Sequence, residues 1–242
     1  MRTRPHWAGE LLVVACLLFV YDLVAGLAKL RTDAALDHGR DLLALSPWGL
    51  EKTADLWLAG IAWLHDPAAY YYDLAHIDVT MVVLVACFVL RAPVYRRART
   101  ALVLVNLIGL AVFLAYPVAP PRLLPGAGFV DIVAESGTWG AWEAGGGVAE
   151  RANEFASMPS LHAAWAVWVA LTVLTMTRRR WLRALGWGHV AMTSVIVVVT
   201  GNHYVIDIFA GALVVAVAWA LAPRLALRRA PELARVPAVA VD

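Results

Sequence analysis

The chain has 242 residues, of which 62% are hydrophobic and only 16% are charged, and its mean hydropathy is +0.69. Water-soluble domains of this size rarely have such a composition, so the chain is interpreted as an integral membrane protein. Its net charge of +2 gives no indication of nucleic-acid binding.

Six apolar stretches come close to the ~20 residues that are needed to cross ~30 Å of hydrocarbon. In chain order they are 7–28, 77–90, 100–116, 160–177, 181–199 and 204–221. Each is expected to be a helix, because backbone groups in lipid must satisfy their own hydrogen bonds. The second stretch is short, and we expect its helix to begin before Ile77. The predicted fold is therefore all-α, a bundle of six transmembrane helices in one domain, 1–242, with 224–242 as a cytosolic tail.

Both cysteines fall inside apolar stretches, so no disulfide framework is expected. The residues 13–16 resemble a lipoprotein cleavage box that ends at Cys16. The apolar run continues beyond Cys16, which favours an uncleaved first helix.

Arginine placement predicts the orientation, because short loops rich in Lys and Arg stay cytosolic. Arginines without acidic neighbours follow the second and fourth stretches, and further arginines precede the first and follow the sixth. All four clusters fall on one side of the membrane. We therefore expect both termini to be cytosolic, and we expect 31–76, 118–159 and 201–203 to lie on the outer face of the cell membrane.

Two outer segments have compositions that suggest parts of a site. The residues 49–65 mix apolar side chains with charged ones, as is typical of a helix that lies in the membrane interface. A stiff proline-rich run beginning at Pro117 is expected to project Arg122. The glycine-rich residues that follow, 126–147, have the composition of a mobile lid or of an ordinary surface loop.

A histidine stands at the mouth of the fourth stretch and another at the mouth of the sixth, where an ionisable side chain is costly and favours a functional interpretation. Asp207 follows His203 by four positions, so on a helix its carboxylate can hold one imidazole nitrogen and leave the other free. His203 and His162 are both expected in the first turn of a helix, where backbone N–H groups favour an anion. Ser160 can cap its helix or donate to a phosphate oxygen.

This arrangement predicts a phosphoryl-transfer site in which His203 attacks phosphorus and His162 gives a proton to the leaving oxygen. Arg122 would stabilise the developing charge. Further candidates for contacts to substrate or phosphate are Asn202, Lys52, Asp131 and His76. For Asp131 and His76 capping or interfacial roles remain open, and Arg122 could instead anchor lipid headgroups at the interface. A metal site built from the two histidines and an aspartate is a competing interpretation.

The motifs resemble those of the type 2 phosphatidic acid phosphatase superfamily over nearly the whole chain. The run Pro-Ser-Leu-His at 159–162 is similar to its second motif, which supplies the acid histidine. The run from His203 to Asp207 is similar to its third motif, which supplies the nucleophile and its partner. Together with residues 116–123 and 128–131, they are most similar to the branch related to inositol phosphorylceramide synthases and their bacterial relatives.

Two departures from the family's motifs reduce the number of cations. Val197 stands where the third motif has an arginine, and Arg122 is followed by Leu123 where the first motif has a proline. The nearest lysine before Arg122 is the distant Lys52. A site with fewer cations suits a singly charged phosphodiester better than a dianionic phosphomonoester.

The resemblance implies a membrane lipid phosphatase or phosphotransferase that works through a phosphohistidine, with no metal or other cofactor. The donor would be a phospholipid or a polyprenyl phosphate, and the acceptor water or an alcohol such as inositol. The missing arginine motivates an alternative from another class, a non-catalytic lipid-binding or lipid-moving protein that keeps an old phosphate pocket. A metal-dependent hydrolase is a third hypothesis.

Overall fold

The computed structural model describes residues 7–46, 49–90, 92–136 and 153–227. The residues 137–147 of the predicted lid and the part of the predicted tail beyond Leu227 lie outside the described residues. Within the described ranges the regular secondary structure is helical, and one isolated parallel bridge joins Val118 to Ala156.

The elements follow in chain order. They are α1 (Trp7–Lys29), α2 (Thr32–Ala44), α3 (Leu50–Ala59), η2 (Ala62–Leu64), α4 (His65–Tyr70), η3 (Tyr71–Ala75), α5 (His76–Leu90), α6 (Ala92–Ala115), η4 (Pro121–Leu123), α7 (Ile132–Glu135), α8 (Leu161–Met176), α9 (Arg180–Val199) and α10 (Val205–Leu227).

Five helical runs in the described part of the chain are long and apolar enough to cross a membrane, which makes this a multi-pass membrane protein. They are Trp7–Lys29, Ala62–Leu90, Val94–Ala115, Arg180–Val199 and Val205–Pro223. The second run begins at Ala62, which confirms that this helix starts before Ile77. The helix α8 is apolar but has only 16 residues, so the sixth crossing stays a prediction, as does the interfacial position of 49–65.

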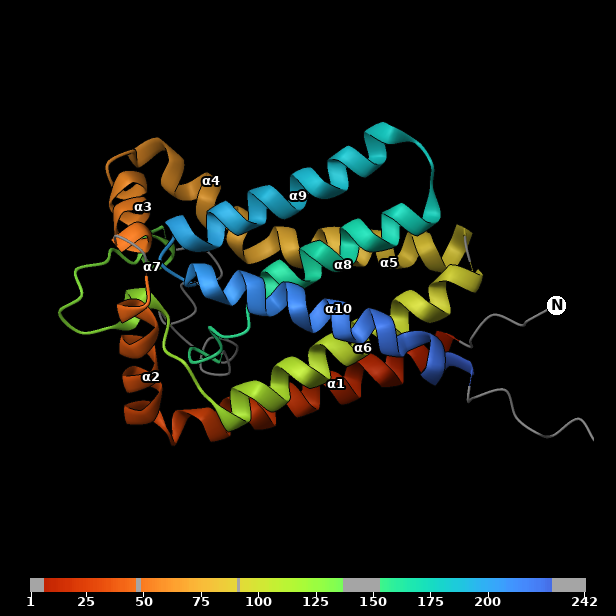
Figure 1. Ribbon diagram of the computed structural model, residues 1–242, viewed down its shortest axis with the longest axis horizontal. Helices are drawn as coiled ribbons and strands as arrows, with labels where there is room; N and C mark the ends of the chain where they lie inside the picture. Colours follow the sequence, from red (N-terminus) through yellow and green to blue (C-terminus); the bar gives the residue numbers. More distant parts are fainter. Residues whose placement is uncertain (1–6, 47–48, 91, 137–152, 228–242) are drawn as a thin grey trace, which may run out of the picture.

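The ends of the long helices sort as the arginine pattern predicts. The start of α1, the end of α10, the α8–α9 connection and the junction of α5 with α6 gather at one end of the bundle (Figure 1). The short helices α2, α3 and α7 gather at the other end. Which end faces the cell interior stays a prediction.

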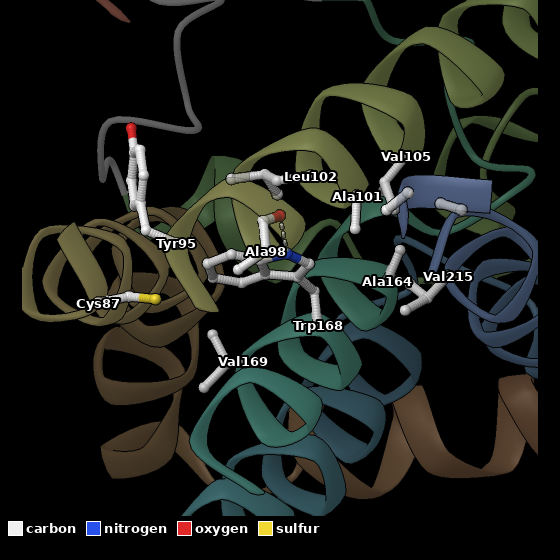
Figure 2. Packing of buried hydrophobic residues seen from close by; sticks show 12 residues of the cluster. Cys87, Tyr95, Ala98, Ala101, Leu102, Val105, Ala164, Trp168, Val169 and Val215 are labelled. Carbon is white, nitrogen blue, oxygen red and sulfur yellow. Dashed lines mark hydrogen bonds between the residues drawn. The ribbon is translucent and has the colours of Figure 1, made fainter. Parts of the chain in front are cut away.

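The core lies where α6, α8 and α10 pack together. Trp168 of α8 is fully buried, and its Nε1–H donates to the carbonyl oxygen of Ala98 in α6 over 2.8 Å (Figure 2). Small side chains around it, such as Ala101 and Ala164, let the helices approach closely, as small residues do between helices in membranes.

The closest approach involves α10 and the start of α8. A Cβ atom added at Gly211 would lie 2.4 Å from the carbonyl oxygen of Ser160, so only glycine fits there. This contact holds the two histidine-bearing segments side by side.

Candidate active site

The two histidine motifs meet where α8 and α10 begin. His162 is in the first turn of α8, as predicted, whereas His203 lies in the turn between α9 and α10. Its predicted place in a first helical turn is wrong, because α10 begins only at Val205. The Nε2 atom of His203 is nevertheless 3.3 Å from the Nδ1 atom of His162.

The other ring nitrogen of His203 is held by two acceptors. Nδ1 lies 2.8 Å from the carbonyl oxygen of Ser157 and 3.3 Å from the Oδ2 atom of Asp207. Neither group can donate, so Nδ1 carries the proton and Nε2 carries the free lone pair in the neutral ring. Asp207 contacts the histidine as predicted, but the carbonyl of Ser157, which sequence reasoning missed, is the closer partner.

Asp207 also organises the backbone around the histidine. Its fully buried Oδ2 accepts hydrogen bonds from Ser157 Oγ at 2.7 Å and from the Tyr204 backbone N–H at 2.9 Å. The carboxylate therefore joins the segment before α8 to the start of α10.

The start of α10 is not the open anion site that its position suggested. The backbone N–H of Tyr204 is taken by Asp207, and that of Val205 donates to Oε1 of Glu51 over 3.1 Å. Glu51 is 2% exposed and also accepts a hydrogen bond from the Ser46 hydroxyl. An α3 carboxylate therefore occupies the place where a phosphate was expected.

The sequence predicted that Ser160 either caps its helix or donates to a phosphate oxygen, and in the structure it caps α8. Its Oγ accepts from the Ala163 backbone N–H over 3.3 Å, and its own N–H donates to the Asp207 carbonyl oxygen over 3.0 Å. The residue is fully buried. It fixes the first turn of α8, which presents His162.

Arg122 is held close to His203 by the turn that precedes α10. Its backbone N–H donates to the Gly201 carbonyl oxygen over 2.9 Å, and its Nε donates to Asn202 Oδ1 over 2.8 Å. The amide nitrogen of Asn202 in turn donates to both the carbonyl oxygen and the hydroxyl of Thr200. Asn202, predicted to contact substrate, is thus used to orient Arg122.

Asp131 contacts Arg122 directly, whereas Lys52 lies against Gly128. Asp131 forms an ion pair with Arg122, and its Oδ1 caps α7 by accepting from the Ala134 backbone N–H over 3.1 Å. The Lys52 ammonium lies against Gly128, where an added Cβ would be 2.9 Å from Nζ. The charge of Arg122 is therefore partly balanced by a carboxylate.

Two aromatic rings from the second membrane-spanning run pack on His162. The His76 ring centroid lies 4.0 Å from that of His162, and the Tyr72 ring stacks on His162 at 4.5 Å. Sequence reasoning missed the contact of Tyr72 with His162, because nothing in the sequence relates Tyr72 to the start of α8.

Asp55 is a second buried carboxylate from α3. Its Oδ2 accepts from the Val130 backbone N–H over 2.8 Å, while its buried Oδ1 has no hydrogen-bond partner among the described residues. Burial raises the pKa of Asp55 to about 6, and the nearby carboxylates of Asp131 and Glu135 act in the same direction. The mixture of residues in 49–65 predicted an interfacial helix, and within that segment Glu51 and Asp55 are buried.

A cavity of about 1400 Å³ extends from the histidines along the bundle. Apolar side chains of α1, α5 and α6 form most of its lining, for example Leu17, Val85 and Leu102. Its polar end includes His162, His203, Arg122, Asn202, Ser157 and His76. Among the described residues, Lys52, Asp131, Ser160 and Asp207 are not part of the lining.

The site can supply a nucleophile and a proton donor side by side, next to an arginine and an apolar cavity. Within the described ranges, no three or more His, Cys, Asp or Glu side chains are grouped as around a metal ion.

Comparison with known proteins agrees with the motifs. The sequence profile of the PAP2 superfamily matches residues 48–221. The phosphoinositol dihydroceramide synthase of Bacteroides thetaiotaomicron is 33% identical over 134 residues, which are 48% of this chain and 42% of that protein. The chain thus spans less than half the length of this curated relative, and no solved structure matches. The predicted superfamily, and the likeness to synthases of inositol phosphate sphingolipids, are confirmed. Because the family profile covers most of the chain and both histidine segments, this chain belongs to the PAP2 superfamily.

Proposed function

We propose that this protein is a membrane enzyme, folded as one domain over 1–242, that cleaves or exchanges a lipid phosphoester through a phosphohistidine on His203. The supporting observation is the 3.3 Å contact between His203 Nε2 and His162 Nδ1 at the polar end of an apolar cavity. A phosphorus centre placed beside both nitrogens can be attacked by one while its leaving oxygen receives a proton from the other.

In the first step the Nε2 lone pair of His203 forms a bond to phosphorus, and the bond from phosphorus to the lipid oxygen breaks. His162 enters this step as an imidazolium; its Nδ1 proton passes to that oxygen, the His162 ring becomes neutral, and a lipid alcohol leaves. The positive charge that develops on the His203 ring is stabilised through Nδ1–H by the Ser157 carbonyl and the Asp207 carboxylate.

In the second step an acceptor hydroxyl gives its proton to His162 Nδ1 while its oxygen attacks phosphorus. The bond between phosphorus and Nε2 of His203 breaks, and the nitrogen regains its lone pair. Water as acceptor makes the protein a phosphatase, and an alcohol makes it a phosphotransferase. No metal or other cofactor takes part in either step.

The surroundings favour a phospholipid donor with a singly charged phosphodiester. The apolar cavity offers room for hydrocarbon, and Arg122 is already paired with Asp131, which leaves limited positive charge for a dianion. The curated relative is named for a product that joins phosphoinositol to a ceramide. Inositol and a long-chain lipid alcohol are therefore the acceptors to test first, and a polyprenyl phosphate is the donor to compare with phospholipids.

The remaining assignments follow from position. Arg122, oriented by Asn202, stabilises charge on the phosphoryl oxygens. Ser160 fixes His162, Asp131 pairs with Arg122, and Lys52 lies against Gly128. The protein resides in the cell membrane with both termini in the cytosol, and its active site faces outward.

The test uses the full chain purified in detergent and incubated with a panel of lipids in the presence of EDTA. The panel contains phosphatidylinositol, phosphatidic acid, phosphatidylglycerol phosphate and a polyprenyl diphosphate, each with and without inositol or a lipid alcohol. Products are identified by mass spectrometry. His203→Ala and His162→Ala are each expected to lower the rate by about 10³-fold or more. His65→Asn is the matched control, because His65 Nε2 is hydrogen-bonded to the carbonyl oxygens of Leu58 and Ala59 and the residue is not part of the cavity lining.

Full activity in either active-site variant would remove this mechanism. Tight phospholipid binding without turnover, unchanged in His203→Ala, would instead favour the non-catalytic lipid-binding alternative. Loss of activity on chelation together with a copurified divalent ion would favour a metal-dependent hydrolase.

A further inference from the structure

A π-helical turn interrupts the second membrane-spanning run next to His162. The run is α-helical over His65–Tyr70 and again over His76–Leu90, whereas Tyr71–Ala75 forms the π-helix η3. Single π-turns inside α-helices are rare and occur frequently at functional sites. Both side chains that pack on His162 come from this turn or its boundary, namely Tyr72 and His76.

The rings of Tyr72, His76 and His203 surround His162. Tyr72 stacks nearly parallel to it, with an interplanar angle of 21° at 4.5 Å. His76 lies 4.0 Å away at 58°, and His203 lies 5.4 Å away at 66°. The χ2 torsion of histidine is broad and roughly two-fold, so the side chain alone does not fix which ring edge faces His203. The neighbouring rings have to do so.

His76 is itself fixed in place. Its Nδ1–H donates to the Tyr72 carbonyl oxygen over 3.0 Å, which ties the ring to the π-turn. Trp165, one turn after His162 on α8, packs on the His76 ring at 5.5 Å. His76 therefore presents a held ring to His162.

We propose that Tyr72 and His76 are positioning residues for His162, which hold its ring so that Nδ1–H faces the leaving oxygen of the substrate. This inference rests on the proposed function, in which His162 is the proton donor. It changes the role of His76, which the sequence suggested as a phosphate contact. A displacement of about 1 Å in such a donor can lower a rate by about 10²-fold, so loosening these rings affects the protonation of the leaving group.

The experiment compares two phosphodiesters that carry the same phosphoryl group but different leaving groups. One leaves as an alkoxide, which needs a proton, and the other as 4-nitrophenolate, which does not. Release of the leaving group is measured in a single turnover of the purified full chain, so that regeneration of His203 does not enter. His76→Phe keeps a ring but loses the bond to the Tyr72 carbonyl, and Tyr72→Leu loses the stacked ring. Tyr70→Phe, at an exposed position of the same helical run outside the cavity lining, is the matched control.

We expect His76→Phe and Tyr72→Leu to slow alkoxide release by about 10- to 100-fold. Release of nitrophenolate should change by less than about 3-fold, KM should stay unchanged, and Tyr70→Phe should behave as the unmodified protein. Tyr72→Phe keeps a ring that can stack on His162 and should recover most of the loss seen in Tyr72→Leu. His162→Ala is expected to slow alkoxide release relative to nitrophenolate release by a still larger factor. His76→Gln, which can still donate to the Tyr72 carbonyl, should recover part of the loss.

Equal losses on both substrates would overturn the positioning role and indicate a general structural one. A change confined to KM would return His76 to the substrate contacts. If His76→Phe does not fold, Tyr72→Leu and His76→Gln decide the question by the same ratio of the two rates. An unchanged rate in His203→Ala would refute the proposed function itself. This outcome differs from equal losses on both substrates and from a change confined to KM, which concern only Tyr72 and His76.

Discussion

Replacement of Asp207 by Asn tests which group sets the tautomer of His203. Nδ1 of His203 is 2.8 Å from the Ser157 carbonyl oxygen but 3.3 Å from Asp207 Oδ2. The carbonyl therefore keeps the proton on Nδ1 after the substitution. An amide oxygen at the position of Oδ2 can still accept from Ser157 Oγ and from the Tyr204 N–H. The change removes the negative charge and leaves the geometry in place.

The size of the effect follows from this difference. A hydrogen bond to a charged group contributes about 1.5–3 kcal/mol and a neutral one about 0.5–1.5 kcal/mol. The loss of about 1–1.5 kcal/mol from a transition state with a charged His203 ring corresponds to roughly a tenfold lower rate. Asp207→Ala is expected to do more, because it leaves the buried Ser157 hydroxyl and Tyr204 N–H without their acceptor at about 1–3 kcal/mol each.

The assay is the single-turnover rate of the purified full chain, accompanied by its thermal unfolding midpoint. Asp207→Asn should lose about tenfold in rate with a nearly unchanged midpoint, whereas Asp207→Ala should lose rate and midpoint together. If Asp207→Asn loses as much activity as His203→Ala while its midpoint is unchanged, the carboxylate and not the carbonyl sets the tautomer, and the reasoning is refuted.

Three further predictions concern stability and packing. Because the pKa of Asp55 is raised to about 6 in the folded protein, folding stability should fall as pH rises from about 4 to about 6. Asp55→Asn should abolish this pH dependence of the thermal unfolding midpoint. An unchanged pH dependence in the variant would contradict the burial of the Asp55 carboxyl. Gly211→Ala should lower both activity and the unfolding midpoint, because its Cβ would lie 2.4 Å from the Ser160 carbonyl oxygen. Gly188→Ala, whose Cβ would meet no neighbouring segment within 4 Å, should keep activity and leave the midpoint unchanged or slightly higher, because alanine favours a helix over glycine; equal losses in the two variants would contradict the close packing at Gly211. Trp168→Phe should lower stability by about 1–2 kcal/mol in equilibrium unfolding, since a buried hydrogen bond is lost; no change would contradict that bond's contribution.

The meeting of the two motifs could be predicted from the sequence because both histidines stand at the ends of apolar stretches. Strong hydrophobic runs fix helix existence well, and the beginning of the second run before Ile77 followed from its length. The position of His203 before the helix was missed, because the apolar run includes Tyr204 and does not show that α10 starts at Val205. Helix boundaries are the least reliable part of such predictions.

The partners of the site residues could not be predicted in the same way. Glu51 and Asp55 belong to the segment that was predicted as an interfacial helix, and nothing in the sequence indicates that both accept hydrogen bonds from backbone N–H groups of distant segments. The group of Ser157 that holds His203 is a backbone carbonyl, which every residue has, so the residue type at 157 does not indicate the contact. Contacts of this kind depend on how loops fold against each other, which periodicity and motif spacing do not encode.

The buried carboxylates explain how a site for an anion is built with so few cations. Glu51 binds the backbone N–H of Val205, and Asp55 binds that of Val130, so each holds an outer segment against the bundle. Asp131 neutralises Arg122 until a phosphate competes for the guanidinium. The carboxylates of Glu51 and Asp55 thus hold the backbone around the pocket, and that of Asp131 lowers the positive electrostatic potential at Arg122. A phosphodiester with one charge can displace Asp131 at little electrostatic cost, whereas a dianion would have its second charge close to these carboxylates. Geometry and charge therefore agree with the proposed substrate class, a phospholipid with a singly charged phosphodiester.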